Sequence, residues 1–397
     1  MAIYYITISA LTGLGYCMTE KKKKQNRTLP YLAVVFISLV FLCSFRYAIG
    51  FDYFSYRDIY EMIAAMPFSA ILTAFWYEPL FFIVCKCFSL CGLPFQLLIT
   101  GVSLFLLFSA VWFIAHYSKS PWMSVYLYIT LQFLAYNMNL MRQSIALCFF
   151  LFAYPFLKSR RLMPYSACIF FGGLFHNSLW FVFPLYFLLF LKLSRKTTAC
   201  LLISTLAGYL FFEPLFSLIH PLLPEKYAVY QQTYFWNSST WEYILPPAAY
   251  CLLIYRFRSR ISDAADRSIY LNSAFYQCLI SLFITKHFIL ERFAVYPFAF
   301  SLIAIPDILA SYREDAPDMV QAKQRYRWIM AVFLLFGGAY FVFASVKGFH
   351  HVYPYVSLLD KSRSAPAGSL MRSGWHSMVF DEIMRRNLPL TGWPGPL

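Results

Sequence analysis

Long apolar runs follow one another along almost the whole chain, and they constrain its fold more than any other feature. Most are near the length of about 20 apolar residues that a helix needs to cross a bilayer. In the whole sequence, 60% of residues are hydrophobic and 13% are charged, against about 45–50% and about 25% in an ordinary soluble domain. A soluble fold has too little interior for this much apolar surface. The sequence therefore predicts an all-α, polytopic integral membrane protein and excludes a soluble enzyme.

Hydropathy alone locates the candidate membrane-spanning runs to within a few residues. The runs are 1–18, 29–45, 79–92, 94–115, 122–138, 143–157, 164–178, 179–192, 199–220, 243–255, 268–289, 293–310 and 328–346. One membrane domain therefore covers 1–356, and a flexible tail rich in Ser, Pro, Gly and Arg covers 357–397. No soluble domain interrupts the series, and the polar stretch 222–242 is small.

Basic residues gather in short loops between the runs and predict the orientation of the chain. The basic loop 21–27 follows the first run instead of preceding it, the reverse of a cleaved signal peptide. We therefore expect a retained first helix with its N-terminus outside. Four more basic loops lie near 158–161, 192–196, 256–267 and 313–327. If each run between them crosses the membrane once, all four loops lie in the cytoplasm. This pattern explains the net charge of +15, so we expect no nucleic-acid partner.

The count of membrane crossings disagrees with the basic loops at one place, between the loop after the second run and residue 121. The basic loops require an odd number of crossings there, yet two runs, 79–92 and 94–115, are visible. Either 79–92 is re-entrant or the mixed stretch 59–76 crosses as well. Both alternatives stay open, and the sequence predicts about 12–14 membrane-spanning helices.

Polar side chains at the ends of these runs are costly near a membrane and need an explanation. The richest set lies at 46–58 and includes Arg46, Asp52 and Arg57 together with Tyr47, Tyr53 and Tyr56. Guanidinium groups suit phosphates or carboxylates, and tyrosine rings suit sugars or the membrane interface. Residue chemistry alone favours the simpler interpretation, a solvated outer loop with an aromatic belt.

More polar residues lie at run ends on the same predicted side of the membrane. They are Glu78, Asn137, Asn139, Arg142, Gln143, His176, Asn177, Ser178, Glu291, Arg292 and Tyr296. Each alone has a structural explanation as a membrane anchor, a turn residue or half of a local ion pair. Basic groups from four different run ends, at 46, 142, 176 and 292, together predict a cavity for an anionic ligand such as a lipid-linked pyrophosphate.

Motifs of soluble nucleotide-binding and hydrolytic enzymes do not occur in the sequence. It contains no GxxxxGK[ST], GxGxxG, HExxH, GxSxG or DxD pattern. We therefore expect no metal, no other cofactor and no use of a nucleotide sugar.

Several polar segments resemble the EpsG family of Wzy-like bacterial polysaccharide polymerases. Segment 45–56, FRYAIGFDYFSY, resembles the family signature FRYxxGxDYxxY. The segments EPL at 78–80, MRQSIA at 141–146, FHNS at 175–178, ERF at 291–293 and YPY at 353–355 look like its later markers, in the same order. The resemblance covers nearly the whole predicted membrane domain.

The resemblance implies an enzyme of the bacterial inner membrane that builds capsular, exopolysaccharide or O-antigen chains. Such enzymes act at the outer face and join oligosaccharide repeats carried on undecaprenyl pyrophosphate. The growing chain leaves its lipid and is transferred to the nonreducing end of an incoming lipid-linked repeat. The resemblance also implies a chain-length regulator and a flippase as partners, besides the lipid bilayer.

This chemistry suggests a role for each polar residue. Arg46, Arg142 and Arg292 are our candidates for binding the pyrophosphate and the charge that develops on it. Candidates for the base are Asp52, Glu78, His176 and Glu291, with Asp52 placed first because it lies closest to the richest cluster. The predicted substrate-binding residues are Tyr47, Tyr53, Tyr56, Arg57, Gln143 and Tyr296.

Three alternatives belong to other functional classes. A lipid-linked oligosaccharide flippase would carry buried polar residues along several helices instead of at outer turns. A membrane O-acyltransferase would place its histidine within reach of a cytoplasmic or transmembrane acyl donor, whereas His176 is predicted outside. An O-antigen ligase usually has one large outer loop, and 222–242 is small.

Overall fold

The computed structural model describes residues 1–20, 27–74, 78–219, 221, 244–314 and 320–360. These residues are helical with connecting turns and contain no strand beyond an isolated bridge between Arg46 and Ser357. The predicted all-α fold class is therefore confirmed. The predicted outer stretch 222–242 and the part of the predicted tail after residue 360 lie outside the described residues.

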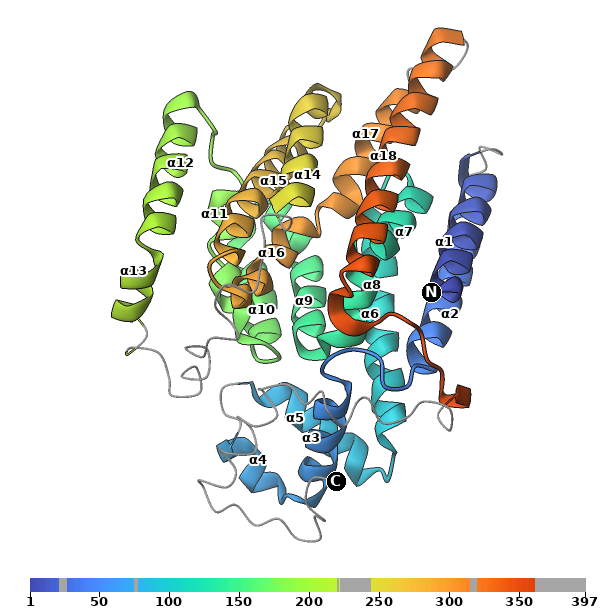
Figure 1. The fold of residues 1–397 in the computed structure, drawn as a ribbon, viewed down its shortest axis with the longest axis vertical. Coiled ribbons are helices and arrows are strands. Elements are labelled where there is room, and N and C mark those ends of the chain that lie inside the picture. Colours follow the sequence, from blue (N-terminus) through green and yellow to red (C-terminus); the bar gives the residue numbers. More distant parts are fainter. Residues whose placement is uncertain (21–26, 75–77, 220, 222–243, 315–319, 361–397) are drawn as a thin grey trace.

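Most helices run side by side in one bundle (Figure 1). In chain order they are α1 (Ala2–Gly15), α2 (Thr28–Ser44), α6 (Phe95–Tyr117), α7 (Pro121–Thr130), α8 (Phe133–Asn139), α9 (Met141–Lys158), α10 (Leu162–Gly173), α11 (Leu185–Leu188), α12 (Arg195–Leu210), α13 (Phe212–Ile219), α14 (Leu245–Phe257), α15 (Ala264–Ile284), α16 (Glu291–Phe298), α17 (Ser301–Glu314) and α18 (Val320–Val346). One large apolar core runs through the bundle, whereas α12 and α13 have no buried residue and lie at its side.

Three described helical stretches are long and apolar enough to cross a membrane: Phe95–Tyr117, Phe288–Glu314 and Val320–Val346. The pair α12 and α13, bent by 75°, is a fourth if it counts as one broken span. Run 122–138 is also broken, because Gln132 between α7 and α8 has a left-handed φ of 70°. A broken apolar helix must place its freed backbone groups inside protein and not in lipid.

Three helices form a separate lobe at one end of the bundle (Figure 1). They are α3 (Tyr53–Ala65), α4 (Phe68–Ala74) and α5 (Pro79–Leu90). The lobe has its own apolar cluster, to which α6 also contributes residues such as Leu98. Lys86 of α5 is buried and donates hydrogen bonds to the carbonyl oxygens of Ile63 (3.4 Å) and Ala64 (2.9 Å). A cation at this position stabilises the carbonyl end of α3.

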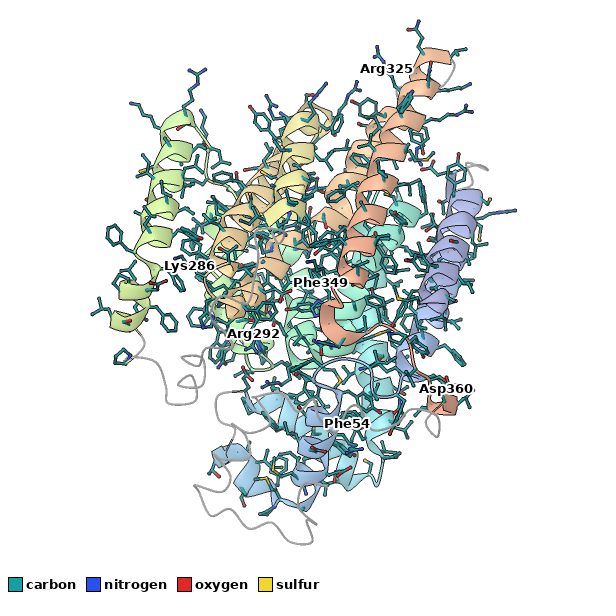
Figure 2. The ribbon with its side chains drawn as sticks, viewed as in Figure 1. Phe54, Lys286, Arg292, Arg325, Phe349 and Asp360 are labelled. Carbon is teal, nitrogen blue, oxygen red and sulfur yellow. The ribbon has the colours of Figure 1, made fainter. Side chains whose placement is uncertain are left out.

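The lobe bears on the two alternatives that the predicted topology left open between residues 46 and 121. Helix α5 has 12 residues, which is about 18 Å of helix and too short for a hydrocarbon core of about 30 Å. It packs against α3 and α4, so neither 79–92 nor 59–76 passes through the bundle. Between residues 46 and 121, only α6 runs from the lobe to the other end of the bundle, and a single crossing there agrees with the odd number that we expect from the basic loops. Figure 2 labels Arg325 at that far end and Phe54 in the lobe.

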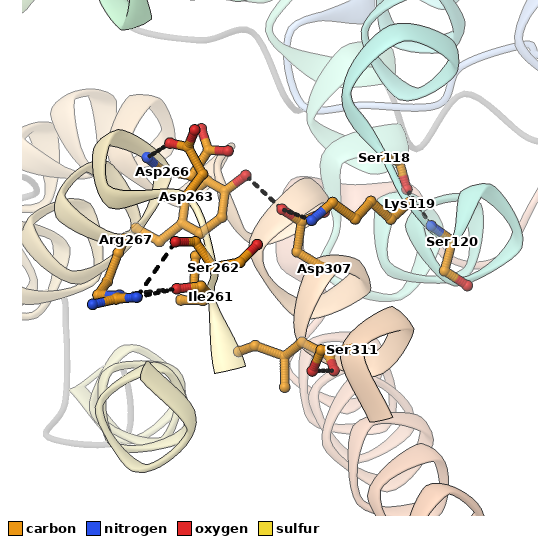
Figure 3. A network of polar contacts seen from close by, with 12 residues as sticks. Ser118, Lys119, Ser120, Ile261, Ser262, Asp263, Asp266, Arg267, Asp307 and Ser311 are labelled. Atoms are coloured by element: carbon orange, nitrogen blue, oxygen red, sulfur yellow. Dashed lines mark hydrogen bonds and ion pairs between the residues drawn. The ribbon is translucent and has the colours of Figure 1, made fainter. Parts of the chain in front are cut away.

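Buried carboxylates join the helices at the end opposite the lobe (Figure 3). Asp307 of α17 lies 4.0 Å from Nζ of Lys119, which belongs to the connection between α6 and α7. Asp266 of α15 accepts hydrogen bonds from the hydroxyl of Tyr154 (2.8 Å) and from Nζ of Lys158 (2.7 Å), both on α9. The sequence did not single out these carboxylates, although they tie together four parts of the bundle.

Candidate functional site

The first turn of α9 meets the lobe, and there Arg142 forms an ion pair with Glu78, the residue before α5. The two side chains are only 7% and 8% exposed. The second carboxylate oxygen of Glu78 accepts a hydrogen bond from the backbone N–H of Asn177 (3.0 Å). Three segments that the sequence identified separately therefore meet at one buried charge pair.

Tyr56 of α3 contacts the same arginine, and Asp52, the residue before α3, interacts electrostatically with Tyr56. The backbone N–H of Arg142 donates to the hydroxyl oxygen of Tyr56 (3.5 Å). Burial raises the pKa of Tyr56 to about 12, Arg142 lowers it, and Asp52 adds to the increase. Tyr56 therefore stays protonated at neutral pH, and its O–H can donate a hydrogen bond to an anion. Asp52 is half-buried at the start of α3, and its N–H donates to Oδ1 of Asn139 (3.0 Å).

A glycine allows the chain to reach this position. Gly50 has a φ of 95°, and a Cβ atom there would lie 3.0 Å from the carbonyl oxygen of Met138 and 3.1 Å from Cα of Asn139. Only glycine combines this backbone conformation with so close an approach. The resulting bend places Asp52 against the end of α8.

A chain of hydrogen-bonding groups begins at His176. Its Nδ1 accepts the backbone N–H of Ser178 (3.3 Å) and lies 2.7 Å from Oγ of the same serine. This oxygen is 2.7 Å from the hydroxyl oxygen of Tyr296, a fully buried residue of α16. Because Nδ1 accepts a backbone N–H, the neutral imidazole carries its proton on Nε2.

Gln143 and Arg292 bind α9 to α16 beside this chain. Nε2 of Gln143 donates to the backbone oxygen of Arg292 (2.5 Å). Tyr296, one turn after Arg292, interacts electrostatically with both Arg292 and Glu78. The structure thus brings the regions of residues 142, 176 and 292 together, as the sequence predicted for the outer ends of these runs.

Tyr136 of α8 lies among these groups, and the sequence analysis missed it. Its hydroxyl interacts electrostatically with Tyr56, Tyr296, Glu291 and Arg292. The available signal was the sequence YNMN at 136–139, where three polar side chains interrupt an apolar run. A tyrosine in an apolar run usually packs in the core, which is why composition alone did not identify it.

Tyr47 and Tyr53, two of the predicted substrate-binding tyrosines, belong to one aromatic cluster with Phe54. The ring centroids of Tyr47 and Tyr53 are 5.9 Å apart, and those of Tyr53 and Phe54 are 5.2 Å apart. Arg57 lies 4.9 Å from the ring centroid of Phe54 and 3.5 Å from the carboxylate of Asp58. Tyr53 is 5% exposed, so most of its ring packs inside the lobe.

Comparison with known protein families gives a match. The model of the EpsG family matches residues 30–357, most of the chain, and this range includes every candidate site residue named above. The protein belongs to the EpsG family. Comparisons with curated proteins and with solved structures give no match. Its apolar helices and its family together identify a membrane protein of polysaccharide biosynthesis.

Arg46 occupies a different place in this EpsG protein from the one that the sequence suggested. Its side chain is 2% exposed, and Nη1 donates to the carbonyl oxygen of Cys43 (2.7 Å) and to Oγ of Ser103 (3.4 Å). Tyr53, Tyr4 and Tyr355 are among its electrostatic neighbours. Arg46 therefore lies near the predicted substrate-binding residue Tyr53 of α3, as well as α1, α2, α6 and the segment after α18, and its side-chain hydrogen bonds go to Cys43 and Ser103.

The remaining sequence predictions concern ligands. Within the described part of this EpsG chain, no three His, Cys, Asp or Glu side chains come close enough together to hold a metal ion. What the site offers is guanidinium groups, a phenol that keeps its proton, and carboxylates beside them. Such a set can bind an anion and accept a proton from a nearby hydroxyl.

Proposed function

We propose that this protein polymerises undecaprenyl-pyrophosphate-linked oligosaccharide repeats at the outer face of the bacterial inner membrane. The observation that supports it best is the meeting of Arg142, Glu78, Tyr56 and the turn at Asn177 at one end of the bundle. A multi-pass chain with its N-terminus outside puts this end at the outer face. A chain-length regulator and a flippase are the partners that this function requires.

The reaction transfers a growing chain from its lipid carrier to a hydroxyl group of the incoming repeat. The acceptor oxygen attacks the anomeric carbon of the chain, and the bond from that carbon to the pyrophosphate oxygen breaks. Its electron pair leaves with the lipid pyrophosphate, so negative charge grows on that oxygen. Arg142 and Arg292 lower the barrier if they bind this charge more strongly in the transition state.

The attacking hydroxyl must give its proton to a base within hydrogen-bond reach. Glu78 is the weakest of the four candidates, because both of its carboxylate oxygens are already held, one by Arg142 and the other by the backbone N–H of Asn177. Asp52 stays the first choice, since it is half-buried beside Tyr56, and His176 and Glu291 follow. Arg46 acts indirectly in this scheme, by holding the backbone before Asp52 in place.

The deciding experiment analyses the lipid-linked repeats and glycan chains of a bacterial strain that lacks this protein. A lost polymerase leaves single repeats on the lipid at the outer face, and the wild-type gene restores long chains. A lost flippase instead leaves the repeats on the cytoplasmic side, and a lost ligase leaves long chains on the lipid. A lost O-acyltransferase leaves chain length unchanged. The last three results would each contradict the proposal.

A further inference from the structure

A cavity of about 80 Å³ lies between α8, α15, α16 and the segment after α18. One water molecule needs only about 10–15 Å³ by the same measure, so the cavity accepts a larger group. Tyr136 and Gln277 are buried in its wall, whereas Glu291, Tyr340 and His350 are half-buried. The cavity therefore has a buried floor and a partly exposed rim.

Two residues that line the cavity each carry a buried polar atom without a partner in the described part of the chain. The hydroxyl of Tyr136 and Oε1 of Gln277 are buried, and within the described residues neither has a hydrogen-bond partner. Buried polar atoms of this kind are rare in proteins, because leaving them without a partner is costly. Both side chains line the cavity, which points to a bound group that supplies a hydrogen-bond donor and an acceptor to them.

The charge of the lining excludes an anion and favours a neutral ligand. No Lys or Arg is among the described residues that line the cavity, and its acidic residue is Glu291. Burial lowers the pKa of His350 to about 4, so its imidazole is neutral at pH 7. Aromatic rings such as Phe298 and Tyr340 complete the wall. Hydrogen-bonding groups beside aromatic faces suit a sugar ring, which has hydroxyls at its edge and C–H groups on its faces.

The cavity lies beside the charged site and has the opposite chemistry. Tyr136 belongs to its floor and also interacts electrostatically with Tyr56 and Arg292. A polymerase joins two unlike groups: the donor sugar is bonded directly to a pyrophosphate, whereas the nonreducing end of the acceptor carries no phosphate. The donor end therefore belongs at the arginines, and the acceptor end needs a neutral neighbouring site.

We propose that this cavity is the subsite for the nonreducing terminal sugar of the incoming repeat. The hydroxyl of Tyr136 and the amide of Gln277 hold hydroxyl groups of that sugar, and the carboxylate of Glu291 accepts a hydrogen bond at the rim. This inference rests on the proposed function, because it takes the acceptor to be a lipid-linked oligosaccharide.

The test measures the binding of two probes to the full-length protein in nanodiscs. One probe is the lipid-free oligosaccharide released by mild acid from the lipid-linked repeat of the producing strain, and the other is undecaprenyl pyrophosphate. Tyr136→Phe and Gln277→Leu each remove one hydrogen-bonding group of the cavity. We expect each to raise the Kd of the oligosaccharide about 10-fold, as the loss of one such contact does, and to leave the Kd of undecaprenyl pyrophosphate within about twofold.

Tyr31→Phe is the matched control. Tyr31 of α2 also has a fully buried hydroxyl without a partner in the described part of the chain, but it does not line the cavity. This variant should bind both probes as the wild type does. Ala294→Leu fills the cavity without removing a polar group, and it should weaken the binding of the oligosaccharide. This variant keeps the test decisive if Gln277→Leu proves too unstable to purify.

The outcomes separate the subsite from the proposed function. If the wild type polymerises while Tyr136→Phe and Ala294→Leu bind the oligosaccharide like Tyr31→Phe, the subsite is wrong and the proposed function stands. If the wild type binds undecaprenyl pyrophosphate but not the oligosaccharide, the subsite is again wrong. A wild-type protein that binds neither probe and forms no polymer contradicts both.

Discussion

Glu78 and Arg142 form a buried ion pair although 64 residues separate them in the sequence. The pair fixes the lobe to the bundle, because Glu78 precedes α5 and Arg142 lies in the first turn of α9. Removing one partner of such a pair leaves an uncompensated charge in a buried place, which is strongly destabilising. The same arginine therefore has a structural task and, in the proposed function, a chemical one.

Arg142→Lys separates these two tasks. Lysine keeps the charge that Glu78 needs, but its ammonium cannot reproduce the two-pronged hydrogen bonding of a guanidinium on a phosphate. We expect chain length in a complemented deletion strain to collapse to single repeats, while the amount of protein in the membrane stays near wild type. The control is Arg256→Lys at an exposed position of α14, which should leave chain length unchanged. Long chains from a well-expressed Arg142→Lys protein would contradict the role of Arg142 in binding pyrophosphate.

Asp52→Asn tests the choice of base. Asp52 sits at the N-cap of α3 without capping the helix through its side chain, and asparagine is as good an N-cap residue as aspartate, so the fold should persist. An amide cannot take up the proton, and general-base catalysis is typically worth about 10²–10⁴-fold. We expect the single-turnover rate in nanodiscs to fall by that factor while the Kd of undecaprenyl pyrophosphate hardly changes. A rate within about tenfold of wild type would move the assignment to Glu291 or His176.

Asp266→Ala tests the network of carboxylates at the far end of the bundle. The change removes the hydrogen-bond partner of Tyr154 and the ion-pair partner of Lys158. We expect a loss of about 3 kcal/mol in unfolding free energy, seen as a lower thermal midpoint in detergent. Asp263→Asn is the control, because asparagine can accept the N–H of Asp266 as the N-cap in the same way. It removes only the longer ion pair with Lys158 (3.8 Å), which is exposed and therefore contributes little. Equal midpoints for the two variants would show that the network contributes little to stability.

Cysteine labelling tests the predicted orientation. In a background without the native cysteines, Glu61→Cys in the lobe should react with an impermeant maleimide on intact spheroplasts, since its side chain is 52% exposed. Ser259→Cys lies in a basic connection that is predicted to be cytoplasmic, and it should react only after permeabilisation. The reverse pattern would place the candidate site on the cytoplasmic face and remove the lipid-linked substrate from consideration.

The positions of single polar residues were predictable to different degrees. The regions around residues 142, 176 and 292 do meet, because each lies at the same end of a different helix and the order of the runs fixes which ends coincide. Arg46 shares that end but turns into the core against Cys43 and Ser103. Hydropathy reports how deep a residue lies along a helix, not which way its side chain points.

The sequence by itself determined that the chain is helical, apolar and built for a membrane, because helices satisfy their backbone groups within one segment. The motifs and their order also indicated the family. Only the tertiary structure decided that α3, α4 and α5 form a lobe at one end of the bundle instead of running through it, and that Glu78 pairs with Arg142. It also placed Tyr136 and Gln277 on the wall of one cavity. Those choices depend on which helix faces pack together, and contacts between residues far apart in the chain leave no periodic signal in a single sequence.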